Sequence, residues 1–139
     1  MSYKNTFILV SPDCPAVKGI VPVSAKENKP VHLIQYELLT EHPYRYDYPE
    51  LLLETHIRHK QISSEEMNRR GQEIRDELFA KKHACLRASA LPKKFGWGVH
   101  YDDDGRIAIY GMDSPEYKSF ADSADTGIQL LLGMRSRKA

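Results

Sequence analysis

A run of basic residues with no acid among them carries most of the chemistry that this sequence offers. Between Lys81 and Tyr101 stand four lysines, one arginine, two histidines, a cysteine and the only tryptophan of the chain. Arginine offers a planar fork of donors that matches phosphate or carboxylate, and lysine adds a point charge. The run therefore predicts a site for a small anionic ligand. The residues expected to bind it are Arg87, Ser89, Lys93, Lys94 and His100.

The geometry of this site depends on the segment Cys85–Leu91. Its alternation of apolar and polar positions predicts a β-strand. Arg87 and Ser89 would then face the same side, together with the thiol of Cys85. The alternative is that Arg87 stabilises the fold by pairing with one of the seven acidic residues in the range Asp102–Asp125. The sequence leaves both interpretations open.

Two other classes of function remain open. Cys85 with His83 or His100 would form a thiolate–imidazole pair, as nucleophilic catalysis requires, although a lone buried cysteine is more often structural. An interaction module for nucleic acid or protein would use the basic run and the three alternating tyrosines of residues 44–48. The near balance of 20 basic and 19 acidic residues argues against nucleic acid, because no overall field attracts it.

The sequence gives no sign of a cofactor or a metal. Phosphate-binding glycine loops, zinc motifs and nucleophile elbows are absent. His56 and His59 have the spacing of two ligands on one helix face, but no cysteine pair or carboxylate motif nearby completes a set of four. We therefore expect no cofactor and no structural metal.

Length and composition indicate one folded domain over residues 1–139. Hydrophobic residues make up 41% of the chain and charged residues 28%, which is ordinary for a globular protein. Two cysteines form no disulfide framework, so a reducing, cytoplasmic compartment is the expectation. The apolar run Phe7–Val10 is too short to span a bilayer, and no membrane partner is expected.

Helical periodicity and capping signals predict most of the remaining elements. Capping-box spacing at Asp47 and at Ser63 starts two helices, although alternation in the first leaves a strand over residues 48–60 as the competing interpretation. Ser114 followed by proline starts another. The predicted helical segments are Val31–Glu41, residues 48–60, residues 63–82, a helix from Ser114, and a last turn or two over residues 128–132.

We predict an α+β fold in which an antiparallel sheet of three to four strands is covered by these helices, mainly on one face. Its strands would be Thr6–Val10, Cys85–Leu91, Gly96–Tyr101 and Arg106–Gly111, the last two joined through an Asp-Gly turn. A loop of two or four residues would place Trp97, Val99, Tyr101, Arg106, Ala108 and Tyr110 on one face. Gly98, His100, Ile107 and Ile109 would share the other. We expect Trp97 to be largely buried.

Several segments together resemble a known group of proteins. They are His32–Tyr44, Cys85–Ser89, Lys94–His100 and Gly105–Tyr110. In combination they are similar to a family of small bacterial proteins of this length, ~140 residues, that has no assigned function. The resemblance covers nearly the whole chain. It implies a single intracellular domain and assigns no catalytic residue.

Overall fold

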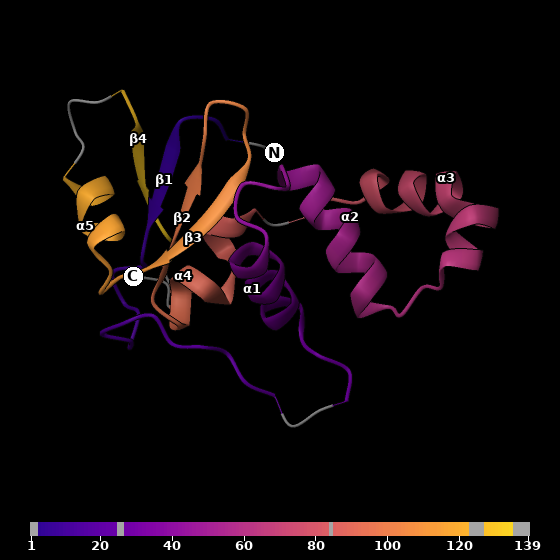
Figure 1. Ribbon diagram of the computed structural model, residues 1–139, viewed down its shortest axis with the longest axis horizontal. Helices are drawn as coiled ribbons and strands as arrows, with labels where there is room; N and C mark the ends of the chain where they lie inside the picture. Colours follow the sequence, from indigo (N-terminus) through magenta and orange to yellow (C-terminus); the bar gives the residue numbers. More distant parts are fainter. Residues whose placement is uncertain (1–2, 25–26, 84, 123–126, 135–139) are drawn as a thin grey trace.

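A four-stranded mixed sheet forms the centre of the protein (Figure 1). The computed structural model describes residues 3–24, 27–83, 85–122 and 127–134. The strands are β1 (Thr6–Leu9), β2 (Trp97–Tyr101), β3 (Ile107–Gly111) and β4 (Gln129–Leu132), in the order β3-β2-β1-β4. The pairs β1–β2 and β2–β3 are antiparallel, whereas β4 lies parallel to β1. The α+β class is confirmed, but the sheet is mixed rather than purely antiparallel.

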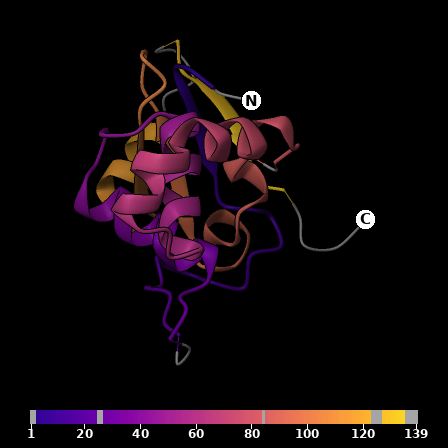
Figure 2. The ribbon, with the colours of Figure 1, turned by 90° about the vertical axis from the view of Figure 1, so that its right-hand side faces the viewer.

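Helices cover both faces of this sheet, most of them one face. They are α1 (Val31–Glu41), α2 (Tyr48–His59), α3 (Ser64–Ala80), α4 (Ala90–Lys94) and α5 (Pro115–Ala121), with a short 3-10 helix η1 (Leu86–Ala88) before α4. In Figure 1, α5 lies on one side of the sheet, and α1, α2 and α4 lie on the other. Figure 2 shows the molecule from the side of α3, the helix that lies farthest from the sheet. None of the helices in the described ranges is long and apolar enough to cross a membrane.

The predicted capping signals operate as expected and resolve the ambiguity over residues 48–60 in favour of a helix. Asp47 accepts a hydrogen bond from the Glu50 amide at 2.9 Å, and Glu50 Oε1 accepts one from the Asp47 amide at 3.1 Å. Ser63 caps α3 through the Glu66 amide, and Ser114 caps α5. Each cap satisfies a helix donor that would otherwise lack a partner.

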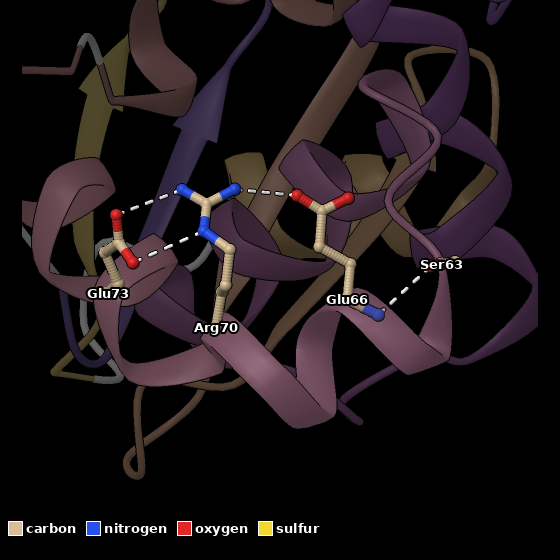
Figure 3. A network of polar contacts seen from close by, with 4 residues as sticks. All are labelled: Ser63, Glu66, Arg70 and Glu73. Atoms are coloured by element: carbon tan, nitrogen blue, oxygen red, sulfur yellow. Dashed lines mark hydrogen bonds and ion pairs between the residues drawn. The ribbon is translucent and has the colours of Figure 1, made fainter.

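Helix α3 carries its charges on an exposed face. Arg70 bridges Glu66 at 2.8 Å and Glu73 at 3.1 Å, one turn to either side (Figure 3). Such exposed pairs contribute little to stability, typically well below 1 kcal/mol each. Only Gly71, Ile74 and Leu78 of this helix are buried. Packing of this narrow stripe therefore holds α3 in place.

The register of the β2–β3 hairpin differs from the prediction. Tyr101 pairs with Ile107, so the loop spans the five residues 102–106. Asp102 Oδ1 accepts from the amides of Asp104 and Arg106, and Gly105 has a φ of 80° that this turn requires. An odd loop length reverses the relative parity of the two strands. Ile107 and Ile109 therefore share the core face with Val99 and Tyr101, and His100 and Tyr110 lie on the opposite face.

The predicted strand over Cys85–Leu91 is wrong. The segment forms η1 followed by α4, which Ser89 caps by accepting from the Leu91 amide at 3.2 Å. Pro92 lies in the first turn of α4, where its missing N–H is tolerated. A strand would have placed Leu86 and Leu91 on opposite faces, but both side chains are buried in the core. Small apolar residues at alternate positions gave this segment of the sequence the pattern of a strand.

The segment Ile128–Leu132 is also corrected, since it forms β4 and not a helical turn. Four residues form too short a helix to be stable alone, whereas β1 offers a free edge for pairing. The Gln129 amide donates to the Asn5 carbonyl at 2.8 Å and the Gly133 amide to the Leu9 carbonyl at 2.7 Å.

Trp97 is partly buried at the edge of the core rather than enclosed in it. Its ring meets Tyr36 edge-on at 5.2 Å, and its indole N–H donates to the Ile20 carbonyl at 2.8 Å. The bond fixes part of the long connection between β1 and α1. Trp97 therefore joins this connection to the sheet.

Candidate anion-binding groove

Three adjoining cavities lie between α1, α2, the C-terminal end of α3 and η1. The central cavity has a volume of about 220 Å³ and is lined by Val31, Gln35, Tyr48, Leu52, Thr55, His56, His59, Leu78 and His83. An outer cavity of about 330 Å³ shares Tyr48, Leu52 and His83 with it and adds Pro49, Phe79, Lys81 and Lys82. An inner cavity of about 270 Å³ shares Val31 and Gln35 and adds His32, Cys85, Ala88, Ser89 and Ala90. We call the three together the basic groove.

The basic groove collects positive charge. Its lining holds four histidines and the two lysines Lys81 and Lys82, and no carboxylate among the described residues contributes to it. Burial lowers the pKa of His56, and the neighbouring cations Lys60 and Lys81 and the imidazoles of His59 and His83 lower it further. Positive groups that depress the pKa of a neighbour create a potential that favours an anion.

Two buried polar residues, Gln35 and Thr55, also line the central cavity. The Thr55 side chain is 4% exposed, and its hydroxyl has no hydrogen-bond partner in the described structure. Gln35 is 9% exposed, and its Oε1 accepts from the Ser89 hydroxyl at 3.2 Å. A buried hydroxyl without a partner is costly and therefore unusual in a folded protein. Thr55 lines the central cavity, but its hydroxyl oxygen is enclosed and the cavity does not reach it.

The histidines of the groove do not converge on a metal site. His83 Nε2 lies 2.7 Å from the Leu78 carbonyl, to which it hydrogen-bonds. In the described part of the chain, the one group of three side chains close enough to hold an ion is Asp102, Asp103 and Asp104, in the hairpin turn. Lysines next to the histidines also oppose a cation. The expected absence of a metal stays a prediction.

The residues predicted from the sequence to bind the anion do not come together. Ser89 lines the inner cavity beside Cys85. Arg87 in η1 donates from Nε to the Leu132 carbonyl at 2.7 Å, and its own carbonyl accepts from the Met134 amide at 2.8 Å. Arg87 thus holds the end of β4 against η1, a structural use that differs from the predicted carboxylate pair.

Lys93 and Lys94 belong to the last turn of α4. Burial lowers the pKa of His32, and the charge of Lys94 lowers it further. His32 stacks on Phe95 at 5.0 Å. The two lysines lie beside the inner end of the basic groove without lining the three cavities described above.

His100 lies on the opposite face of the sheet, away from the groove. Its Nδ1 is 2.8 Å from the Tyr44 hydroxyl, which is also 2.8 Å from the Tyr110 hydroxyl. Tyr44 adopts a left-handed φ of 60°, which is rare for a residue with a side chain. The His100 ring packs on Phe120 at 4.3 Å. These contacts make His100 part of an aromatic cluster under α5.

The structure therefore separates Cys85 from His100. Cys85 Sγ lies 3.7 Å from the Tyr3 hydroxyl, on the side of the sheet that carries α1. His100 cannot serve as its base, because the sheet stands between them. His83 lines the central and outer cavities, whereas Cys85 lines the inner one.

Sequence reasoning noticed some groove residues without assigning them to the site. The pair His56 and His59 was visible as a helix-face motif, and the cations at the end of α3 were visible as a match to the helix macrodipole. Thr55 and Gln35 gave no signal, because their significance depends on packing between α1 and α2. The tertiary arrangement of three helices is what brings the set together.

Fold and groove together define a small α+β protein with a mixed sheet and a basic, carboxylate-free groove beside it. The chain belongs to the family of unknown function DUF6157, which matches residues 1–139. The resemblance to a family of small proteins with no assigned function is thereby confirmed. No curated protein and no solved structure matches the chain.

Arg87→Met tests the structural role of the guanidinium. The variant loses the hydrogen bond to the Leu132 carbonyl, which water can partly replace at this exposed edge, so unfolding should become easier by about 1 kcal/mol. Urea titration measures the change. A variant with unchanged stability that no longer responds to phosphate would instead support the ligand role predicted from the sequence.

Protonation of His100 should weaken the fold. Burial lowers its pKa, with the Asp102 charge opposing in part, so the neutral ring is favoured in the folded state. The contribution of the neutral ring to the free energy of unfolding is fully present above pH ~6.5, the pKa of histidine in the unfolded chain. It is lost as the pH falls below that value. His100→Asn keeps a hydrogen-bonding atom near Tyr44 but cannot titrate. Its unfolding free energy, measured in urea between pH 7.5 and 5, should fall less steeply than that of the wild type. Equal slopes would exclude His100 as the source.

Proposed function

We propose that the protein binds a small anionic ligand in the basic groove. The observation that carries the proposal is the lining itself: histidines and lysines from α2 and from the end of α3, with no carboxylate, in a chain that has 19 acidic residues. Cations without partners in a concave surface attract an anion and form charge-assisted hydrogen bonds with it. The supporting cations are Lys81 and Lys82, and the imidazoles of His56, His59 and His83 add ring nitrogens around them.

A simpler explanation for the lysines is the macrodipole of α3. Lys81 and Lys82 follow the C-terminal end of this helix, where positive charge is favourable by about 0.3–1 kcal/mol. That effect requires no ligand. The two explanations differ in what removal of the charges should do: the macrodipole predicts a loss of stability alone, and a binding site predicts a loss of ligand response.

An enzyme using Cys85 or His100 finds less support. The two residues lie on different faces of the sheet, and the hydrogen-bonded row of Tyr110, Tyr44 and His100 borders none of the three groove cavities. We infer that binding through the basic groove is the principal function.

Removal of the two lysine charges should abolish the response to anions. Inorganic phosphate should raise the melting temperature of the wild type by mass action, and Lys81→Gln/Lys82→Gln should lose at least about 10-fold in phosphate affinity because two charge-assisted contacts disappear. Differential scanning fluorimetry and isothermal titration calorimetry measure both quantities. The unliganded variant should melt within a few degrees of the wild type.

The matched control is Lys93→Gln/Lys94→Gln, which removes the same charge from α4. It should bind phosphate like the wild type. If this control loses binding and the Lys81/Lys82 variant keeps it, the site lies where the sequence first placed it. If the wild type shows no phosphate response at any concentration up to about 10 mM, the proposal is wrong.

Anion binding should strengthen as the pH falls. The pKa of His56 is lowered in the free protein by burial and by surrounding cations, so the ring is neutral near pH 7. A bound anion favours the protonated ring and raises that pKa, which means that binding takes up a proton. Phosphate affinity corrected for the ionisation of phosphate should therefore increase from pH 7.5 to 5.5. His56→Gln should reduce this increase, and an unchanged pH profile would exclude His56 from the site.

A further inference from the structure

We propose that the charge of Arg87 protects a free edge of the sheet and prevents β4 from pairing with β4 of a second copy of the chain. The inference is independent of the proposed function, because Arg87 lines none of the three cavities of the basic groove. Three observations carry it: the unpaired outer edge of β4, the uncharged and apolar sequence of this strand, and the two hydrogen bonds between Arg87 and the end of the strand.

Strand β4 lies at one end of the strand order and pairs only with β1 among the described strands (Figure 1). The amides of Gln129 and Gly133 donate to carbonyls in or next to β1. Backbone groups alternate in direction along a strand, so those of Leu130 and Leu132 point away from β1. Such an edge presents N–H and C=O groups to which another strand can add.

The sequence of β4 lacks the features that usually discourage strand addition. The strand reads Gln-Leu-Leu-Leu, with no charged residue and no proline, and Leu132 is 49% exposed. Exposed edges in native proteins are usually protected by lysine, by proline, by a bulge or by a covering segment. Two copies of an uncharged apolar strand can pair about a two-fold axis without placing like charges of the strands opposite each other. A second copy is therefore the expected occupant of an unprotected β4 edge.

The opposite edge of the sheet, formed by β3, is protected by backbone hydrogen bonds. The Tyr44 amide donates to the Ile107 carbonyl at 2.9 Å, and the Ile107 amide donates to the Tyr46 carbonyl at 2.9 Å. The segment 44–46 thus occupies the outward-facing groups of Ile107, as a neighbouring strand would. In the described ranges no backbone segment pairs with Leu130 in this way, so the protection of β4 depends on a side chain.

Arg87 supplies this protection from η1. Its Nε donates to the outward-facing carbonyl of Leu132 at 2.7 Å, and its own carbonyl accepts from the Met134 amide at 2.8 Å. The first bond occupies an acceptor that an added strand would use, and the second holds η1 beside the end of β4. Partial burial and the Cys85 thiol raise the pKa of Tyr3, whereas Arg87 lowers it, so the guanidinium also lies near the Tyr3 hydroxyl.

A strand that paired along β4 would have to cover the Arg87 guanidinium or displace it. The β4 strand of a second copy contains no acid that could pair with this charge. Burial of a charge without a partner is strongly unfavourable. In a two-fold pair each copy would bring its own Arg87 to the same interface, and the two like charges would repel. The arginine therefore opposes the pairing that the leucines favour.

Arg87→Met removes the charge and keeps an unbranched side chain. On the full chain, sedimentation equilibrium between about 10 µM and 1 mM should show a monomeric wild type and a variant that self-associates at least about 10-fold more tightly. Arg87→Lys separates protection from anchoring, because lysine keeps the charge but lacks the fork of donors. It should lose stability as Arg87→Met does and remain monomeric. If both variants associated equally, loss of the hydrogen bond would be the cause, and the proposed role of the charge would be wrong.

Two further variants locate the effect. Arg69→Met is the matched control, since it removes the same charge from an exposed position on α3, the helix farthest from the sheet, and should stay monomeric (Figure 2). Leu132→Lys in the Arg87→Met background returns a charge to the β4 edge and should restore the monomer. The proposal is overturned if Arg87→Met stays monomeric throughout the concentration range, or if the wild type associates as tightly as the variant. Association that persists after Leu132→Lys would also overturn it, because another surface would then be responsible.

Discussion

The double-sided burial of β1 is the constraint on which the rest of the structure depends. Thr6, Phe7 and Ile8 are all 0% exposed, so both faces of this short strand must be covered. Ile8 belongs to the core under α1 and α4, and Phe7 stacks on Phe120 of α5 at 4.7 Å. Neighbouring strands follow the same alternation, because side chains in a sheet point to opposite faces in turn. This alternation directs Tyr101 into the helix layer and His100 into the cluster under α5, and it thereby separates two groups that the sequence places next to each other.

The basic groove forms outside this core, where packing demands are weaker. Helix α2 contributes Tyr48 and Leu51 to the core, whereas Thr55, His56 and His59 line the cavity that Leu78 of α3 also borders, and α3 itself buries only a narrow stripe. The space between two loosely packed helices needs no complete filling to keep the sheet stable. Cavities and polar groups without partners in this space lower stability locally and leave the core around the sheet intact. The groove therefore forms at the boundary of the core.

Local signals in the sequence predicted most elements, and long-range pairing explains the failures. The caps at Asp47, Ser63 and Ser114 define helices through contacts within four residues, which a sequence displays directly. The hairpin was located correctly, but its faces were wrong because the loop 102–106 has an odd length fixed by bonds to Asp102. The identity of β4 depends on a free edge of β1 more than a hundred residues away. The anchoring role of Arg87 depends on Leu132, which is 45 residues away. For the candidate site, charge was predicted and geometry was not.

The groove also shows how a structural preference can prepare a binding site. Positive charge is favourable after the C-terminus of α3 whether or not a ligand exists, so Lys81, Lys82 and His83 can gather there without destabilising the helix. Like charges placed together would normally repel, and the dipole offsets part of that repulsion. The Thr55 hydroxyl lacks a hydrogen-bond partner in the described structure, but so does the hydroxyl of Tyr101, which lines none of the three cavities, so a missing partner does not by itself mark a site.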